Sequence, residues 1–188
     1  MIEKAIQFTK QAFEQYLKNK MSLHESFVAV NSVIQPDGSL TKSTKNKVIL
    51  SLINIVRETS KPFSYRNKRL DTGYSNTVPP EKYNLDVLVS SNFDDYSESL
   101  KFLNEAILFF QINASISSET NSNIPTGIEK LEFELETISY HQMHSLWNAM
   151  GAKYQPSVIY KMRLLTLDPN QTRGFIPEII ETSNMIGQ

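Results

Sequence analysis

The stretch EKLEFELETISYHQMHSLWNAMGAKYQPSVIYKMRLLTL, residues 129–167, predicts a strand, a helix and a second strand in close succession. Its segment 130–136 alternates apolar and charged residues strictly, which is typical of a strand with one buried and one exposed face. Ser139 and Gln142 have the spacing of a capping box, and Gly151 stands where a left-handed helix end is expected. Four residues of this unit are predicted to lie in the core: Phe133, Leu135, Trp147 and Tyr160.

Apolar periodicity outside this unit predicts two further helices and three further strands. The helices are expected over 2–20 and 96–111, and the strands over 26–34, 47–56 and 83–91. The strand over 47–56 is apolar on both faces and is therefore expected to be central. The polar stretch 115–126 is expected to be a loop. The first three strands are separated by loops, which favours antiparallel or mixed pairing. We therefore expect an α+β fold: a single mainly antiparallel or mixed sheet of about five strands, with three helices packed mostly on one face.

The expected domain organisation is a single domain over residues 1–167 followed by a C-terminal extension over 168–188. A chain of 188 residues, 40% of them hydrophobic, can build one sizeable core. The segment 58–80 is polar and contains Gly73 and a Pro-Pro pair, so it is expected to be a long loop. The extension is a candidate interaction arm.

The composition excludes several classes of chemistry. There is no cysteine, so a disulfide framework, a thiolate metal site and a cysteine nucleophile are ruled out. The six glycines form no phosphate-binding pattern. The carboxylates at 132, 134 and 136 could bind a cation, but a solvated strand face, or one that pairs with a basic partner, is favoured. We expect no enzymatic activity, no cofactor and no metal.

Two smaller clusters of titratable residues have competing interpretations. His141 and His144 could share a helix face and hold a metal, but a zinc site needs further ligands. A polar helix flank explains both histidines more simply. Asp94 and Asp95 could form an acid pair, whereas capping of the following helix accounts for them without added chemistry.

Two segments are candidates for contact with other molecules. One is the basic-aromatic stretch 61–69, which could contact a protein or, as the alternative function, bind single-stranded nucleic acid through stacking and charge. The other is the apolar part of the extension, which must pack on its own domain or on a neighbour. The candidate interface residues are Lys61, Phe63, Tyr65, Arg66, Lys68, Arg69, Phe175, Ile176, Ile179 and Ile180.

At the level of the whole chain, the sequence resembles the cap, or tail-terminator, proteins of phage-tail-like contractile injection systems of the anti-feeding-prophage and virulence-cassette type. The run HSLWNAMGAKYQPSVIYKMRLLT, residues 144–166, carries the most specific part of the resemblance. Other matching runs are MIEKA at 1–5, KVILSLINI at 47–55, YNLDVLV at 83–89, YSESLKFL at 96–103, ILFFQ at 107–111 and GIEKLEFELE at 127–136.

This resemblance implies a tail-terminator-like fold and a structural role. Proteins of this family form a ring that ends the sheath and inner tube and joins the two. The expected partners are other copies of the chain in a homohexameric ring, the sheath protein and the inner tube protein, with no membrane and no nucleic acid. The expected location is the bacterial cytoplasm during assembly, and then the injection particle, whether released or anchored.

Overall fold

The computed structural model describes residues 1–34, 42–58, 66–70, 73–77, 81–166 and 172–177. The helices are α1 (Ile2–Met21), η1 (Lys42–Thr44, a 3-10 turn), α2 (Tyr96–Ile112) and α3 (Tyr140–Met150). The strands are β1 (Val28–Val30), β2 (Lys47–Arg57), β3 (Arg66–Leu70), β4 (Gly73–Thr77), β5 (Glu81–Asn92), β6 (Ser115–Ser117), β7 (Ile128–Glu136), β8 (Ser157–Thr166) and β9 (Thr172–Pro177).

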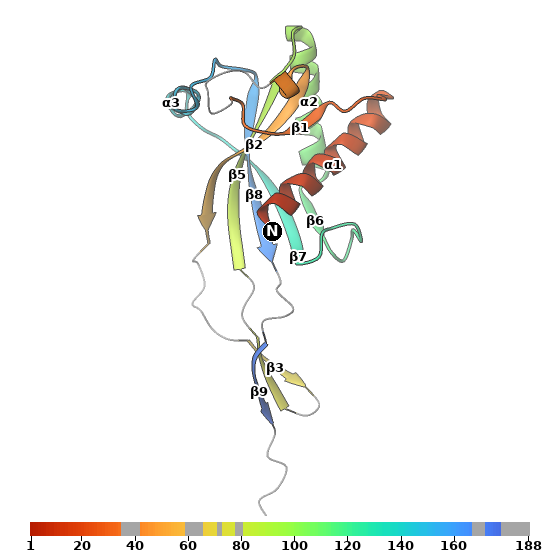
Figure 1. Cartoon of the computed structure of the whole chain (residues 1–188), viewed down its shortest axis with the longest axis vertical. Coiled ribbons are helices and arrows are strands. Elements are labelled where there is room, and N and C mark those ends of the chain that lie inside the picture. The colour runs from red at the N-terminus through yellow and green to blue at the C-terminus, as the bar shows by residue number, and fades with distance from the viewer. Residues whose placement is uncertain (35–41, 59–65, 71–72, 78–80, 167–171, 178–188) are drawn as a thin grey trace, which may run out of the picture.

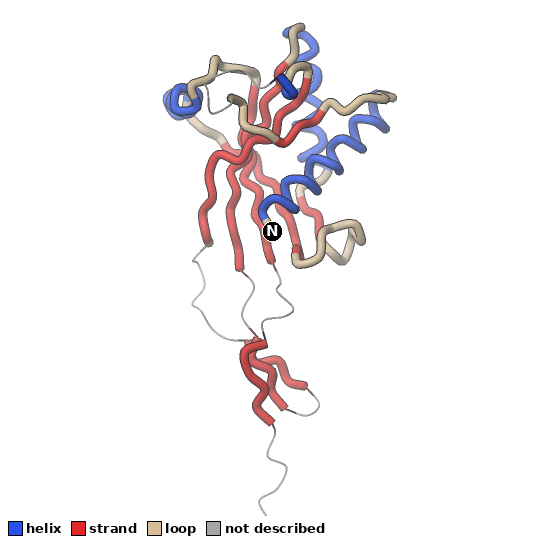
Figure 2. Tube along the Cα trace, viewed as in Figure 1, coloured by secondary structure: helices blue, strands red, loops and turns tan. Residues whose placement is uncertain are grey.

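The main sheet has six strands in the order β1-β2-β5-β8-β7-β6 (Figure 1). Only β1 and β2 are parallel, and every other neighbouring pair in this sheet is antiparallel. The mixed, mainly antiparallel α+β fold expected from the sequence is therefore confirmed. The additional strand is β6, which forms within a polar stretch expected to be a loop. A separate three-stranded sheet has the order β3-β4-β9 (Figure 2).

Helices α1 and α2 cover one face of the main sheet and enclose the larger core. Aromatic rings dominate this core: Phe13 and Phe109 lie 5.0 Å apart between ring centroids, and Phe110 lies 4.2 Å from Tyr160 on β8. Phe133 on β7 joins the same cluster. Because Phe13 comes from α1 and Phe110 from α2, this cluster joins both helices to the sheet.

Helix α3 packs on the opposite face, where it forms a second, smaller core. Trp147 lies there with Val33, Leu88 and Ile159, and its side chain is 3% exposed. Successive strand residues point to opposite faces, so β5 contributes Leu88 to this core and its neighbours to the larger one. Two of the three helices thus share a face, and α3 lies on the other.

The ends of α3 are as the sequence predicts. Ser139 Oγ accepts from the backbone N–H of Gln142, and the Gln142 side chain accepts from the backbone N–H of Ser139 in return. Gly151 ends the helix with φ of 69°, a left-handed conformation that glycine adopts without steric cost.

Three of the four predicted core residues are buried, and the fourth prediction is wrong. Phe133, Trp147 and Tyr160 are buried, whereas Leu135 is 50% exposed. The alternation of side chains along β7 places Leu135 on the same face as the buried Phe133, but Leu135 lies near the end of the strand. The pairing of β6 with β7 reaches only Glu132, so no strand of the described chain covers β7 beyond Phe133 on that side.

Glu14 on α1 gives the fold a measurable dependence on pH. Burial raises the pKa of its carboxyl, but hydrogen bonds from Lys10 and Ser26 and the charges of Lys10 and Lys18 outweigh burial and lower the pKa overall. The contribution to stability is therefore present above the ordinary pKa of 4.5 and is lost as the pH falls through the lowered value. Glu14→Gln should cost about 0.3–0.5 kcal/mol at neutral pH.

Urea unfolding of the wild type and of Glu14→Gln at a series of pH values measures this contribution. The difference in unfolding free energy should shrink between about pH 5 and about pH 3. A difference that stays constant over that range would contradict the assignment to Glu14 ionisation.

Candidate functional site

Three strands of the main sheet reach the same end of that sheet and continue toward the second sheet. Arg57 at the end of β2 pairs with Tyr83 on β5, and Glu81 at the start of β5 pairs with Thr166 at the end of β8. The chain continues from β2 to β3, enters β5 from β4, and continues from β8 to β9. The order β3-β4-β9 therefore repeats the order β2-β5-β8 of the strands to which they connect, and Figure 1 shows the connecting segments.

This second sheet brings together the two segments that the sequence suggested as separate contact regions. β3 and β4 come from the segment expected to be a loop, and β9 comes from the C-terminal extension. In the register, Arg69 is opposite Tyr74, which is opposite Ile176. In the next row, Lys68 is opposite Ser75, which is opposite Phe175. The prediction that 58–80 is a long loop is wrong, because it contains the hairpin β3-β4.

The candidate interface residues fall into two groups. Arg66, Lys68 and Arg69 lie on β3, and Phe175 and Ile176 lie on β9. The remaining candidates lie outside the described residues: Lys61, Phe63, Tyr65, Ile179 and Ile180. Residues 66–69 of the basic-aromatic stretch thus lie in a strand of an antiparallel sheet.

The carboxylates of β7 pair with basic residues of the same chain. Glu134 accepts from Arg163 at 2.6 Å, Glu132 pairs with Lys130 at 2.6 Å, and Glu136 pairs with Lys161. These ion pairs form within the chain, on the strand face for which the sequence favoured solvent or a basic partner over a bound cation.

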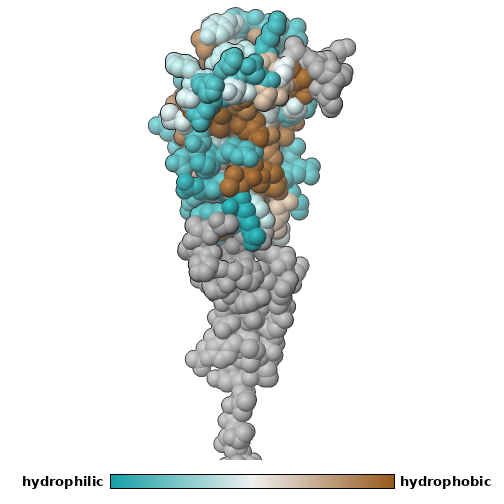
Figure 3. Space-filling model, turned by 90° about the vertical axis from the view of Figure 1, so that its left-hand side faces the viewer, coloured by the Kyte–Doolittle hydropathy of each residue, from teal (hydrophilic) through white to brown (hydrophobic). Residues whose placement is uncertain are grey.

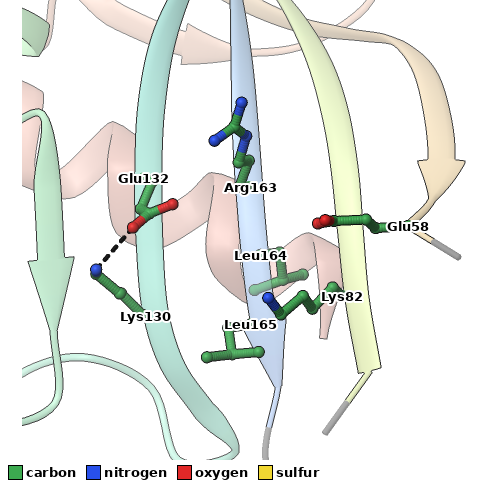
Figure 4. A pocket seen from close by; sticks show the side chains of 7 residues that line it. All are labelled: Glu58, Lys82, Lys130, Glu132, Arg163, Leu164 and Leu165. Atoms are coloured by element: carbon green, nitrogen blue, oxygen red, sulfur yellow. Dashed lines mark ion pairs between the residues drawn. The ribbon is translucent and has the colours of Figure 1, made fainter. Parts of the chain in front are cut away.

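Three of these ion-paired residues, Lys130, Glu132 and Arg163, line a pocket of about 250 Å³ (Figure 4). Figure 4 shows Arg163 between Glu132 on β7 and Glu58 beyond β5. On the neighbouring part of β8, the hydrogen bond to Glu136 is the main cause that raises the pKa of Lys161. The nearby charges of Asp86 and Glu134 add to the rise, and desolvation opposes it. Acidic side chains of β7 thus face basic side chains of β8 across this side of the main sheet.

The remaining candidates have structural explanations. Asp95 caps α2 by accepting from the backbone N–H of Ser97 at 2.8 Å, and Asp94 pairs with Lys45 at 3.0 Å. His144 lies 3.3 Å from the side-chain amide of Asn148. Among the residues that the structure describes, no group of three or more His, Cys, Asp or Glu side chains is placed to hold a metal ion. No helix in the described ranges has the length and apolar character needed to cross a membrane.

The exposed apolar surface on β2 was not expected from the sequence. Apolar residues on both faces suggested a central, covered strand. In the structure the first half of β2 is buried, but Leu52, Ile55 and Val56 are 37%, 45% and 48% exposed. Figure 3, which turns the left-hand side of Figure 1 toward the viewer, shows an apolar patch on this side of the molecule.

Comparison with known proteins identifies the family. The sequence matches the Pvc16 N-terminal domain family over residues 8–179. The chain belongs to this family. No curated protein sequence matches it.

Two solved structures share the fold of this Pvc16 N-terminal domain. One is the sheath/tube terminator of an extracellular contractile injection system, PVC, in the extended state, with a TM-score of 0.56, 10% identity and 96% of this chain covered. The other is the tube-terminating cap of the anti-feeding prophage, with a TM-score of 0.53, 10% identity and 95% of this chain covered. This chain spans 62% and 60% of their lengths. The resemblance noted in the sequence is confirmed at the level of family and fold.

Proposed function

We propose that this chain is a structural cap, or tail terminator, of a contractile injection system. It forms a ring that ends the sheath and inner tube and joins the two. The observation that carries this proposal is the match to the Pvc16 N-terminal domain family over residues 8–179. The shared fold with two caps supports it. The role is non-enzymatic, and the chain acts as part of the particle.

The proposed partners are further copies of this chain, the sheath protein and the inner tube protein. A closed homohexameric ring requires a heterologous interface, in which two different surfaces of each copy meet. We propose that the second sheet provides one of these contact surfaces. Its three strands combine the basic residues of β3 with the apolar residues of β9, and these were the segments expected to make contacts.

The first test is the mass of the purified protein in solution, measured by light scattering over a range of concentrations. A hexamer that forms as concentration rises is the expected result. If the chain remains a monomer, inner tube ends are added as a template, and binding to them is then expected. A chain that stays monomeric and does not bind inner tube ends would overturn the proposal.

The second test is electron microscopy of particles assembled without this chain. A terminator limits polymerisation, so its removal should give sheaths of uncontrolled length or sheaths detached from the inner tube. Particles of unchanged length and integrity would contradict a capping role. A matched strain that expresses the wild-type chain from a second copy of its gene should restore normal particles.

A further inference from the structure

The two ends of the main sheet offer different surfaces to another molecule. At one end, β2 begins at Lys47, opposite the last residue of β5, Asn92. At the other end, Arg57 and Glu81 lie next to the connections to the second sheet. Because β5 has 12 residues, these two ends are roughly 40 Å apart. Figure 1 shows the second sheet and the start of α2 at opposite ends of the molecule.

A groove of about 430 Å³ opens at the end that carries the start of α2. Three nearly parallel aromatic rings lie along it: the ring centroid of Phe102 is 4.4 Å from that of Phe93 and 5.2 Å from that of Phe27. Phe102 is buried, whereas Phe27 and Phe93 are half-buried. Met21 and Leu23, at the end of α1, extend this apolar lining. The groove is within the size range of pockets that bind ligands.

Carboxylates form the rim of this groove. Asp94, Asp95 and Glu98 line it, against one ammonium group, that of Lys101, among the described residues. Asp95 caps α2, and Asp94 pairs at 3.0 Å with Lys45, a contact between two exposed side chains. The pair of Glu98 with Lys101 is 3.5 Å long and also exposed, so it contributes little to stability and is readily exchanged. The rim therefore keeps an excess of negative charge beside an apolar floor.

The strands of the second sheet have the opposite charge. Arg66, Lys68 and Arg69 belong to β3 and Arg173 to β9, and none of the three strands contains aspartate or glutamate. Asp71, between β3 and β4, offsets one of these positive charges. The net charge of the whole chain is −1, so acidic residues elsewhere balance the basic residues at this end. The second sheet and the groove are thus complementary in charge.

We propose that the second sheet of one copy binds the groove at the start of α2 on the next copy. Basic residues of β3 meet the carboxylates of the rim, and an apolar residue of β9 packs against the aromatic rings. Arginine suits both parts of the groove, because its guanidinium pairs with carboxylates through parallel hydrogen bonds and stacks on aromatic rings. This contact rests on the self-association in the cap proposal and names the two surfaces that meet.

Distance prevents one copy from making this contact with itself. Only residues 78–80 separate β4 from β5, so at roughly 3.5 Å per residue the end of β4 stays within about 14 Å of Glu81. The groove lies beyond the other end of β5, roughly 40 Å away. A surface at one end that binds a different surface on the next copy is a heterologous contact, which closes a ring or extends a filament. The contact is therefore of the type that a ring requires.

Charge reversal tests the contact, with self-association followed by light scattering. Glu98→Arg in the groove and Arg69→Glu in β3 should each raise the dissociation constant at least about tenfold, because each places like charges opposite one another. The two changes combined in one chain should restore most of the affinity, since the pair is then reversed in sign. The matched control is Glu119→Arg, an exposed position outside the groove, which should associate as the wild type does.

Introduced cysteines provide a second test that leaves the charges in place. The chain contains no cysteine, so the introduced thiols are the only ones. Asn67→Cys in β3 is mixed with Ser97→Cys beside the rim, on chains with tags of different size, and a short bismaleimide joins neighbouring thiols. A product of one chain of each kind is expected. Asn67→Cys mixed with the exposed Ser118→Cys should give far less of it.

Thermal melting should show that the charge variants fold, and the cysteine test replaces any that does not. A folded Glu98→Arg variant that associates as the wild type does would overturn this contact and leave the cap proposal standing. So would a double variant that associates no better than the single ones, or no Asn67–Ser97 product in an associating sample. A chain that neither self-associates nor binds inner tube ends would overturn both proposals. If Glu98→Arg weakens binding to tube ends but not self-association, the groove belongs to the tube protein and the proposed occupant is wrong.

Discussion

Replacing Trp147 by alanine should lower the free energy of unfolding by about 3–5 kcal/mol. The side chain is 3% exposed and joins α3 to the sheet through Leu88 and Ile159, so its removal leaves a cavity in the smaller core. The larger core on the other face does not contain Trp147 and should persist. Equilibrium denaturation in urea measures the change.

Trp147→Phe is the matched control for this experiment. The indole Nε1 has no hydrogen-bond partner among the described residues, so phenylalanine removes a buried donor while keeping much of the apolar volume. We expect a clearly smaller loss than for alanine. If the chain assembles as a cap, Trp147→Ala should assemble less well only because it is less stable, and assembly should recover at low temperature, where the variant is folded. Failed assembly in a fully folded Trp147→Ala variant would instead place Trp147 at an interface.

Truncation after Thr166 should dismantle the second sheet and leave the main sheet folded. It removes β9, which pairs with β4 over Gly73–Thr77. The remaining hairpin β3-β4 has two strands, and an isolated two-stranded hairpin is marginally stable in water. Amide exchange in residues 66–77 should become fast, while the melting temperature changes little. If the second sheet is a ring contact, assembly should weaken at least about tenfold.

A truncation that removes only residues 178–188 provides the control, because it keeps β9. Amide exchange in β4 should stay slow in this variant. Its assembly then shows whether the second sheet or residues 178–188 contribute to the contact. A melting temperature that falls as much as in Trp147→Ala would show that β9 supports the main core. Full assembly without β9 would remove the second sheet from the proposed contacts.

The sequence predicts best where a few neighbouring residues determine the structure. The capping box of Ser139 and Gln142 and the left-handed Gly151 define α3 through contacts within a few residues. The alternation in 130–136 predicts β7, and Asp95 marks the start of α2. The family resemblance, spread along the chain, was also visible from the sequence alone.

The sequence did not predict which residues of a strand are covered. Leu135 has the parity of a core residue, and β2 is apolar on both faces, yet Leu135 and the second half of β2 are exposed. Burial of these residues depends on where β1, β6 and the helices end relative to β2 and β7. The apolar pattern within a strand does not encode the ends of its neighbours.

By itself, the sequence determined the helices, the main strands, the α+β class and the family, because local periodicity, capping and turn residues act over short distances. Only the tertiary structure decided that β4, already paired with β3, also pairs with β9, about a hundred residues later in the chain. Main-chain hydrogen bonds join these strands, and because every residue type offers the same main-chain groups, the pairing leaves little trace in the sequence. The same reason explains why the exposure of the second half of β2, beyond its pairing with β1, became visible only in the folded sheet.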